Sequence, residues 1–169
     1  MRIRRYRPSD QGAVIALFRE SMWELAPPHL GGEFQAYIER AIGEELGRIE
    51  EYYFKRDDQG FWVADAGLLI GMVGIERRDH DCAELRRMAV ARAQRKKGIA
   101  RALLATAEAF CIQQRYRKLV LSTSQLQQAA SQLYQSSGYS MVREEKAAVP
   151  SHKSVGAGLT RYHYEKALG

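Results

Sequence analysis

The sequence has few residues that could form disulfides or metal sites, and no segment that could anchor it in a membrane. Only two cysteines occur among its 169 residues, Cys82 and Cys111, and neither stands at a spacing typical of metal ligands. We therefore expect two reduced thiols, no bound metal and a cytoplasmic location. No run approaches the roughly 20 apolar residues that cross a bilayer, and no apolar segment of a signal peptide follows the N-terminal arginines. These absences predict a protein with no membrane partner.

The common nucleotide-binding loops are also missing, because neither G-x-x-x-x-G-K-[ST] nor G-x-G-x-x-G occurs. No internal repeat or low-complexity segment is present. Apolar residues make up 46% of the chain and charged residues 27%, which is ordinary for a globular protein. The length and composition predict a single domain over residues 1–169 with a core of its own.

The chain carries a net charge of +6, and five of its cations lie close together in the sequence. Basic proteins often bind nucleic acid, but no aromatic residues are interleaved with these cations as a platform for stacking bases. We therefore expect no nucleic-acid partner and a small phosphate-bearing ligand instead. The clustered cations are Arg92, Arg95, Lys96, Lys97 and Arg101.

The segment from Arg95 to Arg101 is the most informative in the chain. It lies between an expected strand at 83–90 and an expected helix at 101–111. Backbone N–H groups and the helix dipole at such a junction favour a phosphate. Gly98 allows close approach of the backbone, and Ala100 keeps the first helical turn small. The alternative is a basic surface turn that only caps a helix.

Hydrophobic periodicity and turn residues predict the order β-α-α-β-β-β-α-β-α-β-β. Residues 149–158, with Pro150, Gly156 and Gly158, are expected to form a mobile loop. Gly138 is expected to end the last helix as a C-cap. The expected strands are 3–6, 61–64, 68–77, 83–90, 118–122, 139–144 and 162–166. Four helices are expected: the first begins near Pro8, the second runs from about Phe34 to Ile49, and the last two span 101–111 and 126–137.

The pattern R-x-x-G-x-A, formed by Arg95, Gly98 and Ala100, resembles the acetyl-CoA loop [RQ]-x-x-G-x-[GA] of the GNAT family of N-acetyltransferases. The order of elements is similar to the GNAT fold over essentially the whole chain. The resemblance implies an α/β fold with a mixed, mostly antiparallel central sheet flanked by helices. It also implies acetyl-CoA as co-substrate and no metal. The cofactor-binding residues that it implies are Met88, Ala89, Val90, Arg95, Lys96, Lys97, Gly98, Ile99, Ala100, Arg101, Gln127 and Tyr134.

The segment from Ala130 to Tyr139 resembles the family's A-x-x-LY-x-x-x-G-[FY], whose first tyrosine reaches the cofactor sulfur. Tyr134 is therefore expected to protonate the leaving thiolate, although a packing role is the alternative. The family often has asparagine where this chain has Gln127. With Glu84 to Val90, this stretch looks like the camello-like N-acetyltransferases, which acetylate free amino groups of amino acids and cysteine S-conjugates. Animal members of that subgroup carry a membrane segment, which this chain lacks.

The acceptor amine needs a general base and binding residues, and several polar residues are candidates for these roles. Glu84 is the expected general base, acting directly or through water, unless it only pairs with a neighbouring arginine. His80 is an alternative base. His29 is a candidate substrate contact, and Arg86 could pair with a substrate carboxylate.

The sequence predicts transfer of an acetyl group to the primary amine of a small molecule such as an amino acid, by direct attack in a ternary complex. A protein or peptide acetyltransferase and a non-catalytic acyl-CoA sensor are the alternatives. An exposed edge strand near the C-terminus could pair two copies in a homodimer.

Overall fold

The computed structural model describes residues 1–169. The strands are β1 (Arg2–Arg5), β2 (Gly60–Asp65), β3 (Leu69–Arg77), β4 (Cys82–Val90), β5 (Lys118–Ser124), β6 (Ser140–Ala147) and β7 (Leu159–Ala167). The α-helices are α1 (Gln11–Leu25), α2 (Gly31–Glu44), α3 (Ile49–Tyr53), α4 (Ile99–Gln113) and α5 (Gln128–Ser136). Short 3-10 helices are η1 (Pro8–Asp10), η2 (Pro28–Leu30), η3 (Leu46–Arg48) and η4 (Arg92–Gln94).

All seven strands form one sheet in the order β1-β2-β3-β4-β5-β7-β6. Only β4 and β5 are parallel, and every other neighbouring pair is antiparallel. The predicted mixed, mostly antiparallel sheet is therefore confirmed. Because β7 lies between β5 and β6, the edge strand at the C-terminal end of the sheet is β6, on which Met141 and Val142 are exposed. Pairing of two copies along this edge stays a prediction.

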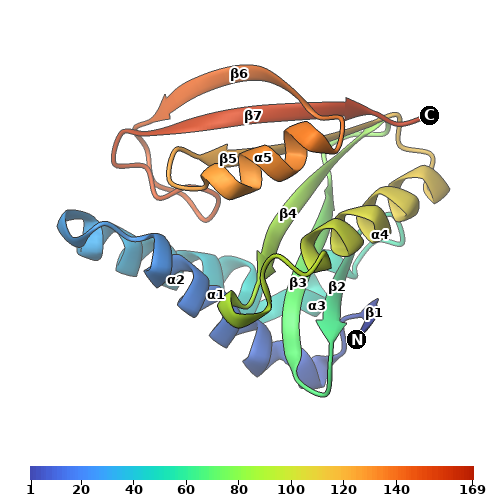
Figure 1. Ribbon diagram of the computed structural model, residues 1–169, viewed down its shortest axis with the longest axis horizontal. Helices are drawn as coiled ribbons and strands as arrows, with labels where there is room; N and C mark the ends of the chain where they lie inside the picture. Colours follow the sequence, from blue (N-terminus) through green and yellow to red (C-terminus); the bar gives the residue numbers. More distant parts are fainter.

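Helices cover both faces of the sheet (Figure 1). Helices α1, α2 and α3 pack on one face, and α4 and α5 pack on the other. Strand β2 serves both layers, because Phe61 and Val63 point to the first core and Trp62 and Ala64 to the second. Cys82 and Cys111, on β4 and α4, are free and buried. None of the helices combines the length and the apolar character needed to cross a membrane.

The second helix is shorter than predicted. It was expected to continue to Ile49, but α2 ends at Glu44, and η3 and the unpredicted α3 follow. Glu45 leaves helical geometry with φ −137° and ψ −67°, and its side chain is completely buried. Its carboxylate reaches Arg86 and Arg87 on β4, so a tertiary ion pair overrides the local helical pattern.

The loop at 149–158, predicted to be mobile, is held in place by polar contacts. Lys153 Nζ lies 3.2 Å from Glu76 Oε2, and His152 Nδ1 lies 3.1 Å from Glu44 Oε2. Arg87 donates to the carbonyl of His152 at 2.5 Å. These contacts fasten the loop to α2, β3 and β4, so it forms part of the structure around the site.

Strands β4 and β5 pair for only a short distance and then separate (Figure 1). The parallel ladder covers Cys82 to Glu84 and goes no further. On its other side β4 carries a bulge, because the register with β3 shifts between Met72 and Gly74. Arg87 lies in this bulge with φ +57°, a left-handed conformation that costs energy for a side chain other than glycine. The bulge bends β4 away from β5 and opens the sheet.

Candidate active site

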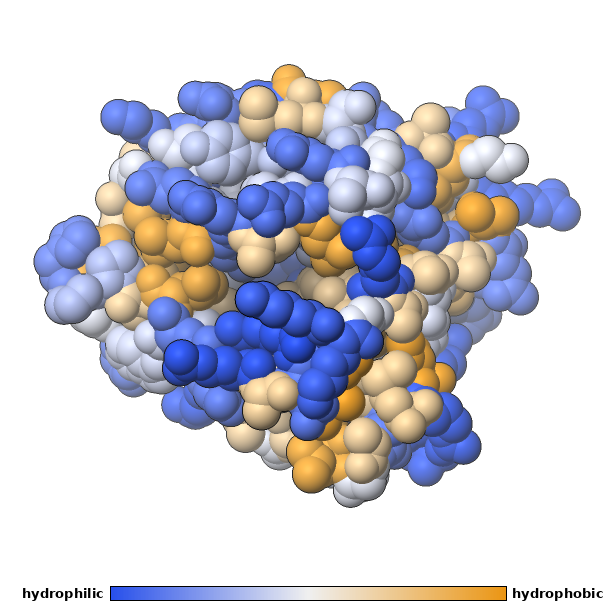
Figure 2. Space-filling model, in the orientation of Figure 1, coloured by the Kyte–Doolittle hydropathy of each residue, from blue (hydrophilic) through white to orange (hydrophobic).

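A cavity of about 590 Å³ lies where β4 and β5 separate. Its walls come from helices α1, α2 and α5, from strands β3, β4, β5, β6 and β7, and from the segment joining β6 to β7. Figure 2 shows a hollow across this face of the molecule, with hydrophilic surface along its lower edge, where Figure 1 places the loop before α4. The cavity is thus bounded by both halves of the sheet, and the basic loop lies outside the residues that line it.

The bulged part of β4 presents backbone to this cavity. Met88 and Ala89 line it, and after Glu84 the β5-facing edge of β4 has no strand partner. A backbone edge without a partner can accept an extended ligand as a strand would. Val90 is buried in the core, and its carbonyl oxygen accepts a hydrogen bond from Arg95 Nε at 3.1 Å. Met88 and Ala89 are therefore better placed than Val90 for the predicted contact.

The loop before α4 has the geometry of an anion site. Gly98 is the N-cap of α4 with φ +81°, and a Cβ built on it would meet nothing within 4 Å. The first helical hydrogen bond runs from the Ala102 N–H to the Gly98 carbonyl at 3.0 Å, so the preceding amides have no helical partner. Lys96 and Lys97 are exposed beside them. Unpaired amides, the helix dipole and two lysines together suit a diphosphate.

The other side chains of the loop fasten it to the protein. Arg95 Nη1 lies 2.9 Å from Glu24 Oε2 on α1, and Arg101 donates to Ser136 Oγ on α5 at 3.0 Å. Ile99 is buried in the core, and Ala100 packs against it. These residues hold the loop in shape, and its backbone amides and the two lysines are left exposed.

Tyr134, on α5, lines the cavity and is buried. Its ring packs edge-on against Tyr139 with centroids 5.8 Å apart. Burial raises the pKa of Tyr134 above its usual value of 10, and no hydrogen bond from the protein contributes to that shift. The phenol is therefore a protonated donor facing the cavity. Gln127 also lines the cavity, and its Oε1 accepts from the Ser124 N–H at 3.0 Å, which ties the start of α5 to β5.

Glu84 is buried at the same cavity and is surrounded by cations. Its carboxylate oxygens lie 2.6 Å from Arg78 Nε, 3.5 Å from Lys153 Nζ and 3.7 Å from Arg86 Nε. Glu84, the predicted general base, therefore does line the cavity. It also pairs with arginines, which was the alternative role predicted for it. Glu84 could take a proton only through a water or after release of these contacts.

Arg86 and Arg87 form a buried ionic cluster with Glu45. Arg86 Nη2 lies 2.8 Å from Glu45 Oε1 and Arg87 Nε lies 2.9 Å from Glu45 Oε2, while Tyr53 donates to the same carboxylate at 2.5 Å. Burial would raise the pKa of Glu45, but the two guanidinium groups outweigh it and hold the pKa at about 2. This cluster fixes the bulge of β4, because both arginines come from it.

Sequence reasoning missed Glu45, which stands in the sequence as one more residue of a helical stripe. Arg86 was predicted to bind substrate. It does line the cavity, but its guanidinium is occupied by Glu45 and by Glu76, 2.6 Å away. His29 and His80 are exposed and lie outside the residues that line the cavity. Neither histidine is therefore retained as a site residue.

The architecture matches known acetyltransferases. The model of the acetyltransferase (GNAT) family matches residues 19–139. The chain belongs to the GNAT family. A GNAT acetyltransferase of Staphylococcus aureus superposes with a TM-score of 0.76 at 22% identity, over 99% of both chains. An aminoglycoside 6'-N-acetyltransferase solved with coenzyme A superposes with a TM-score of 0.73 at 18% identity, over 100% of this chain and 98% of that one.

Curated GNAT relatives are more similar in sequence. The N-acetylaspartate synthetase of Danio rerio is 38% identical over 134 residues, which cover 78% of this chain and 45% of that protein. N-acetyltransferase 8 of Rattus norvegicus is 32% identical over 140 residues, 78% of this chain and 61% of that protein. The predicted similarity to the camello-like subgroup is thus confirmed. The chain spans about half the length of these relatives.

A charge placed at Gly98 tests the anion site of this GNAT domain. We expect Gly98→Asp to weaken acetyl-CoA binding by about tenfold or more, because two like charges about 4 Å apart repel by roughly 1–4 kcal/mol at a partly exposed site. Gly98→Asn is the matched control, since both residues tolerate left-handed backbone and differ in charge. Titration calorimetry with acetyl-CoA measures the difference. Equal affinities of the two variants would contradict the assignment.

Proposed function

We propose that this protein transfers the acetyl group of acetyl-CoA to the free primary amine of a small amino acid. The observation that carries the proposal is the cavity at the divergence of β4 and β5. It brings together the β5-facing edge of β4 at Met88 and Ala89, which has no strand partner, the phenol of Tyr134 and a cation-rich end under the loop at 149–158. The names of the similar N-acetylaspartate synthetases make aspartate the first acceptor to test.

The loop at 149–158 supports a small acceptor over a protein chain. Ser151, Lys153, Ser154 and Val155 line the cavity, and the salt bridges of Lys153 hold the loop across it. An extended peptide would need an open groove at this place. The fastened loop covers part of the cavity and leaves a space that suits an amino acid better than an extended chain.

Acetyl-CoA supplies the acyl group as a thioester, and residues of this chain would bind the cofactor, stabilise the thioester oxygen and protonate the leaving sulfur. The loop before α4 would hold the diphosphate with the amides near Gly98 and with Lys96 and Lys97. The backbone of Met88 and Ala89 would pair with the pantetheine arm, and an N–H group there would donate to the thioester oxygen as negative charge develops. Tyr134 Oη would give its proton to the departing sulfur.

The acceptor must lose a proton before its nitrogen can attack. The α-ammonium of a free amino acid, like the ammonium of a lysine side chain, is almost fully protonated at neutral pH, so either acceptor needs a base. Glu84 lines the cavity and could serve as that base through a water, although Arg78 and Lys153 lie against its carboxylate.

Thiol release from acetyl-CoA tests this function. We expect release that depends on amino acids, measured across a panel of acidic, neutral and S-substituted amino acids, polyamines and lysine peptides. Release with lysine peptides alone would contradict the small-molecule acceptor. A rise in melting temperature with acetyl-CoA but no release with any amine would instead favour an acyl-CoA sensor.

A further inference from the structure

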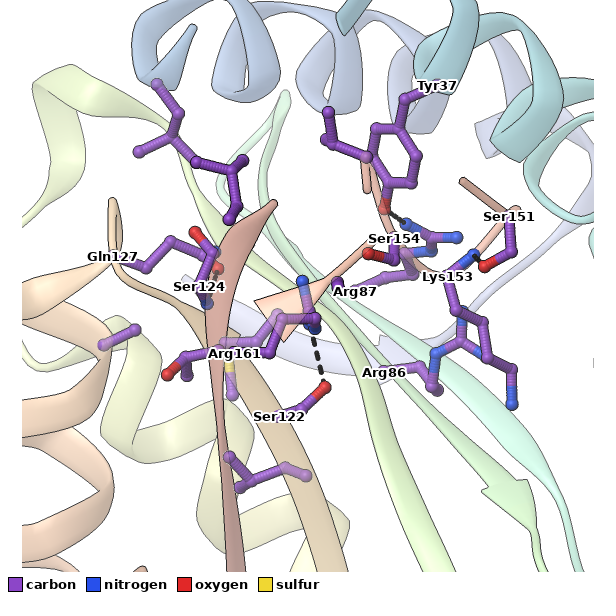
Figure 3. Close-up of a pocket in the computed structure, with 18 of the residues that line it drawn as sticks. Tyr37, Arg86, Arg87, Ser122, Ser124, Gln127, Ser151, Lys153, Ser154 and Arg161 are labelled. Carbon is purple, nitrogen blue, oxygen red and sulfur yellow. Dashed lines mark hydrogen bonds between the residues drawn. The ribbon is translucent and has the colours of Figure 1, made fainter. Parts of the chain in front are cut away.

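Arg161 differs from every other arginine that lines the cavity. It lies on β7, opposite Ser124 of β5 and Glu145 of β6, and is partly buried. Its Nη2 donates to Ser122 Oγ at 2.8 Å, and no carboxylate lies within 4.0 Å of its guanidinium. Figure 3 shows the side chain reaching across the cavity toward Arg87, with Arg86 and Lys153 beyond.

The other buried or half-buried cations around Arg161 already have counter-ions, and Lys146, which lines the cavity without one, is exposed to solvent. Arg86 and Arg87 are paired with Glu45 at 2.8 Å. Lys153 lies between Glu76, at 3.2 Å, and Glu84. The carboxylate nearest on the neighbouring strand, Glu145, lies 2.7 Å from His163 instead. Each acidic group in or behind this wall is therefore engaged, and Arg161 is left without one.

A guanidinium group in this position is electrostatically unsatisfied. Burial lowers the pKa of Arg161, and Arg86 and Arg87 lower it further, while Tyr37 and Glu145 oppose that shift without reversing it. Charges taken out of water are normally paired, because burial without a partner costs several kcal/mol. A single neutral hydrogen bond to Ser122 does not compensate for that cost, whereas an anion bound in the cavity would compensate for it.

The chemistry of that anion follows from the donor. A guanidinium presents its N–H groups in a planar fork that matches the two oxygens of a carboxylate. Ser122 occupies one Nη2 donor and leaves others free toward the cavity. The same cavity contains Tyr134 and the Met88–Ala89 backbone, where the acetyl group would be transferred. A molecule held by its carboxylate at Arg161 can therefore place its amine in the reaction space.

We propose that Arg161 binds a carboxylate of the acceptor and so selects an acidic amino acid over uncharged amines. The inference rests on the proposed function and names the class of substrate for the same site. The arginines of β4 position the bulge, and Arg161 on β7 recognises the acceptor. Arginines of the two halves of the sheet thereby have different roles.

The test compares L-aspartate with L-asparagine and isoasparagine, in which one or the other carboxylate is an uncharged amide. For wild-type protein we expect kcat/KM to be at least tenfold higher with aspartate than with one of the two amides. Arg161→Gln should lower kcat/KM for aspartate by about 10–100-fold, mainly through KM, as expected for a lost charged hydrogen bond. The same variant should have nearly the wild-type rate with the amide that reacts more slowly, so the preference for aspartate over that amide should disappear. Arg161→Lys should retain part of this preference.

Arg143→Gln is the matched control. Arg143 is an exposed cation on β6 that does not line the cavity, so its loss should leave the preference for aspartate unchanged. A melting-temperature rise with acetyl-CoA, retained in Arg161→Gln, shows that the variant is folded with an intact cofactor site. Undiminished preference for aspartate in Arg161→Gln would overturn the proposal.

Binding of succinate separates this inference from the proposed function. Titration calorimetry in the presence of coenzyme A should detect binding to wild type and to Arg143→Gln, and at least tenfold weaker binding to Arg161→Gln. That result with no turnover of any amine would overturn the transferase proposal and support the carboxylate site. Turnover of neutral amines without selective succinate binding would support the transferase and overturn the role of Arg161.

Discussion

Replacing Tyr134 by phenylalanine is expected to lower kcat for acetyl transfer by roughly 10²–10⁴-fold, the usual contribution of a positioned proton donor. The ring would stay packed against Tyr139 and Tyr164, so the fold should survive. The departing thiolate would lose its proton donor. Steady-state thiol release at saturating acetyl-CoA and amine measures the effect, and an unchanged rise in melting temperature with acetyl-CoA would show that binding is intact.

Tyr139→Phe provides the matched control for that experiment. Tyr139 is also buried on the same side of the sheet, but its hydroxyl donates to Glu108 Oε1 at 2.8 Å and does not line the cavity. Its loss should leave kcat within a fewfold of wild type. A Tyr134→Phe variant as active as Tyr139→Phe would remove Tyr134 from the mechanism.

The raised pKa of Tyr134 also predicts how the rate depends on pH. A donor is lost as the pH rises through its pKa, and burial moves that point above the usual value of about 10. We therefore expect no loss of kcat up to about pH 10 that can be assigned to Tyr134. A fall in kcat near pH 8 in wild type that is absent from Tyr134→Phe would contradict the high pKa.

Glu45→Gln is expected to lower the free energy of unfolding by about 3–5 kcal/mol, because it leaves two buried guanidinium groups without their shared counter-ion. Glutamine fills the same volume, so loss of charge is the main change. Arg87, which stands in left-handed backbone at the bulge, would lose two contacts of 2.8 and 2.9 Å. Urea unfolding at neutral pH measures the loss. Acetyl-CoA turnover should fall as well, because the bulge orients the backbone of Met88 and Ala89.

The cost of Glu45→Gln should depend on pH. In the folded protein the pKa of Glu45 is about 2, below the value of 4.5 for an unperturbed glutamate. The stability that its charge contributes is therefore fully present above pH 4.5 and is lost as the pH falls toward 2. The difference in unfolding free energy between wild type and Glu45→Gln should narrow over the same range. A difference that stays constant down to pH 2 would contradict a charged Glu45.

Glu51→Gln is the control for burial. Glu51 is also paired with an arginine, Arg48, at 2.5 Å, but both side chains are more than half exposed. Exposed pairs contribute at most about 1 kcal/mol, so this substitution should have little effect. An equal loss in both variants would mean that burial does not decide the role of Glu45.

The sequence determined the parts of this protein that depend on neighbours along the chain. Gly98 and the basic residues before it define the loop at the start of α4, and Gly138, with φ +91°, follows α5 as predicted. Hydrophobic periodicity fixed nearly every strand and helix to within a few residues. Such signals are local, because a turn or a helical stripe is set by residues a few positions apart.

Only the tertiary structure decided what the cavity contains. Glu45 meets Arg86 and Arg87 across more than forty residues of chain, and that contact ends α2 and shapes the bulge of β4. Arg161 enters the site because β7 is inserted between β5 and β6, an arrangement that no local pattern encodes. Which charges find partners depends on how the folded chain places them. The sequence therefore identified the family, and the fold showed which arginine of the cavity has no carboxylate partner.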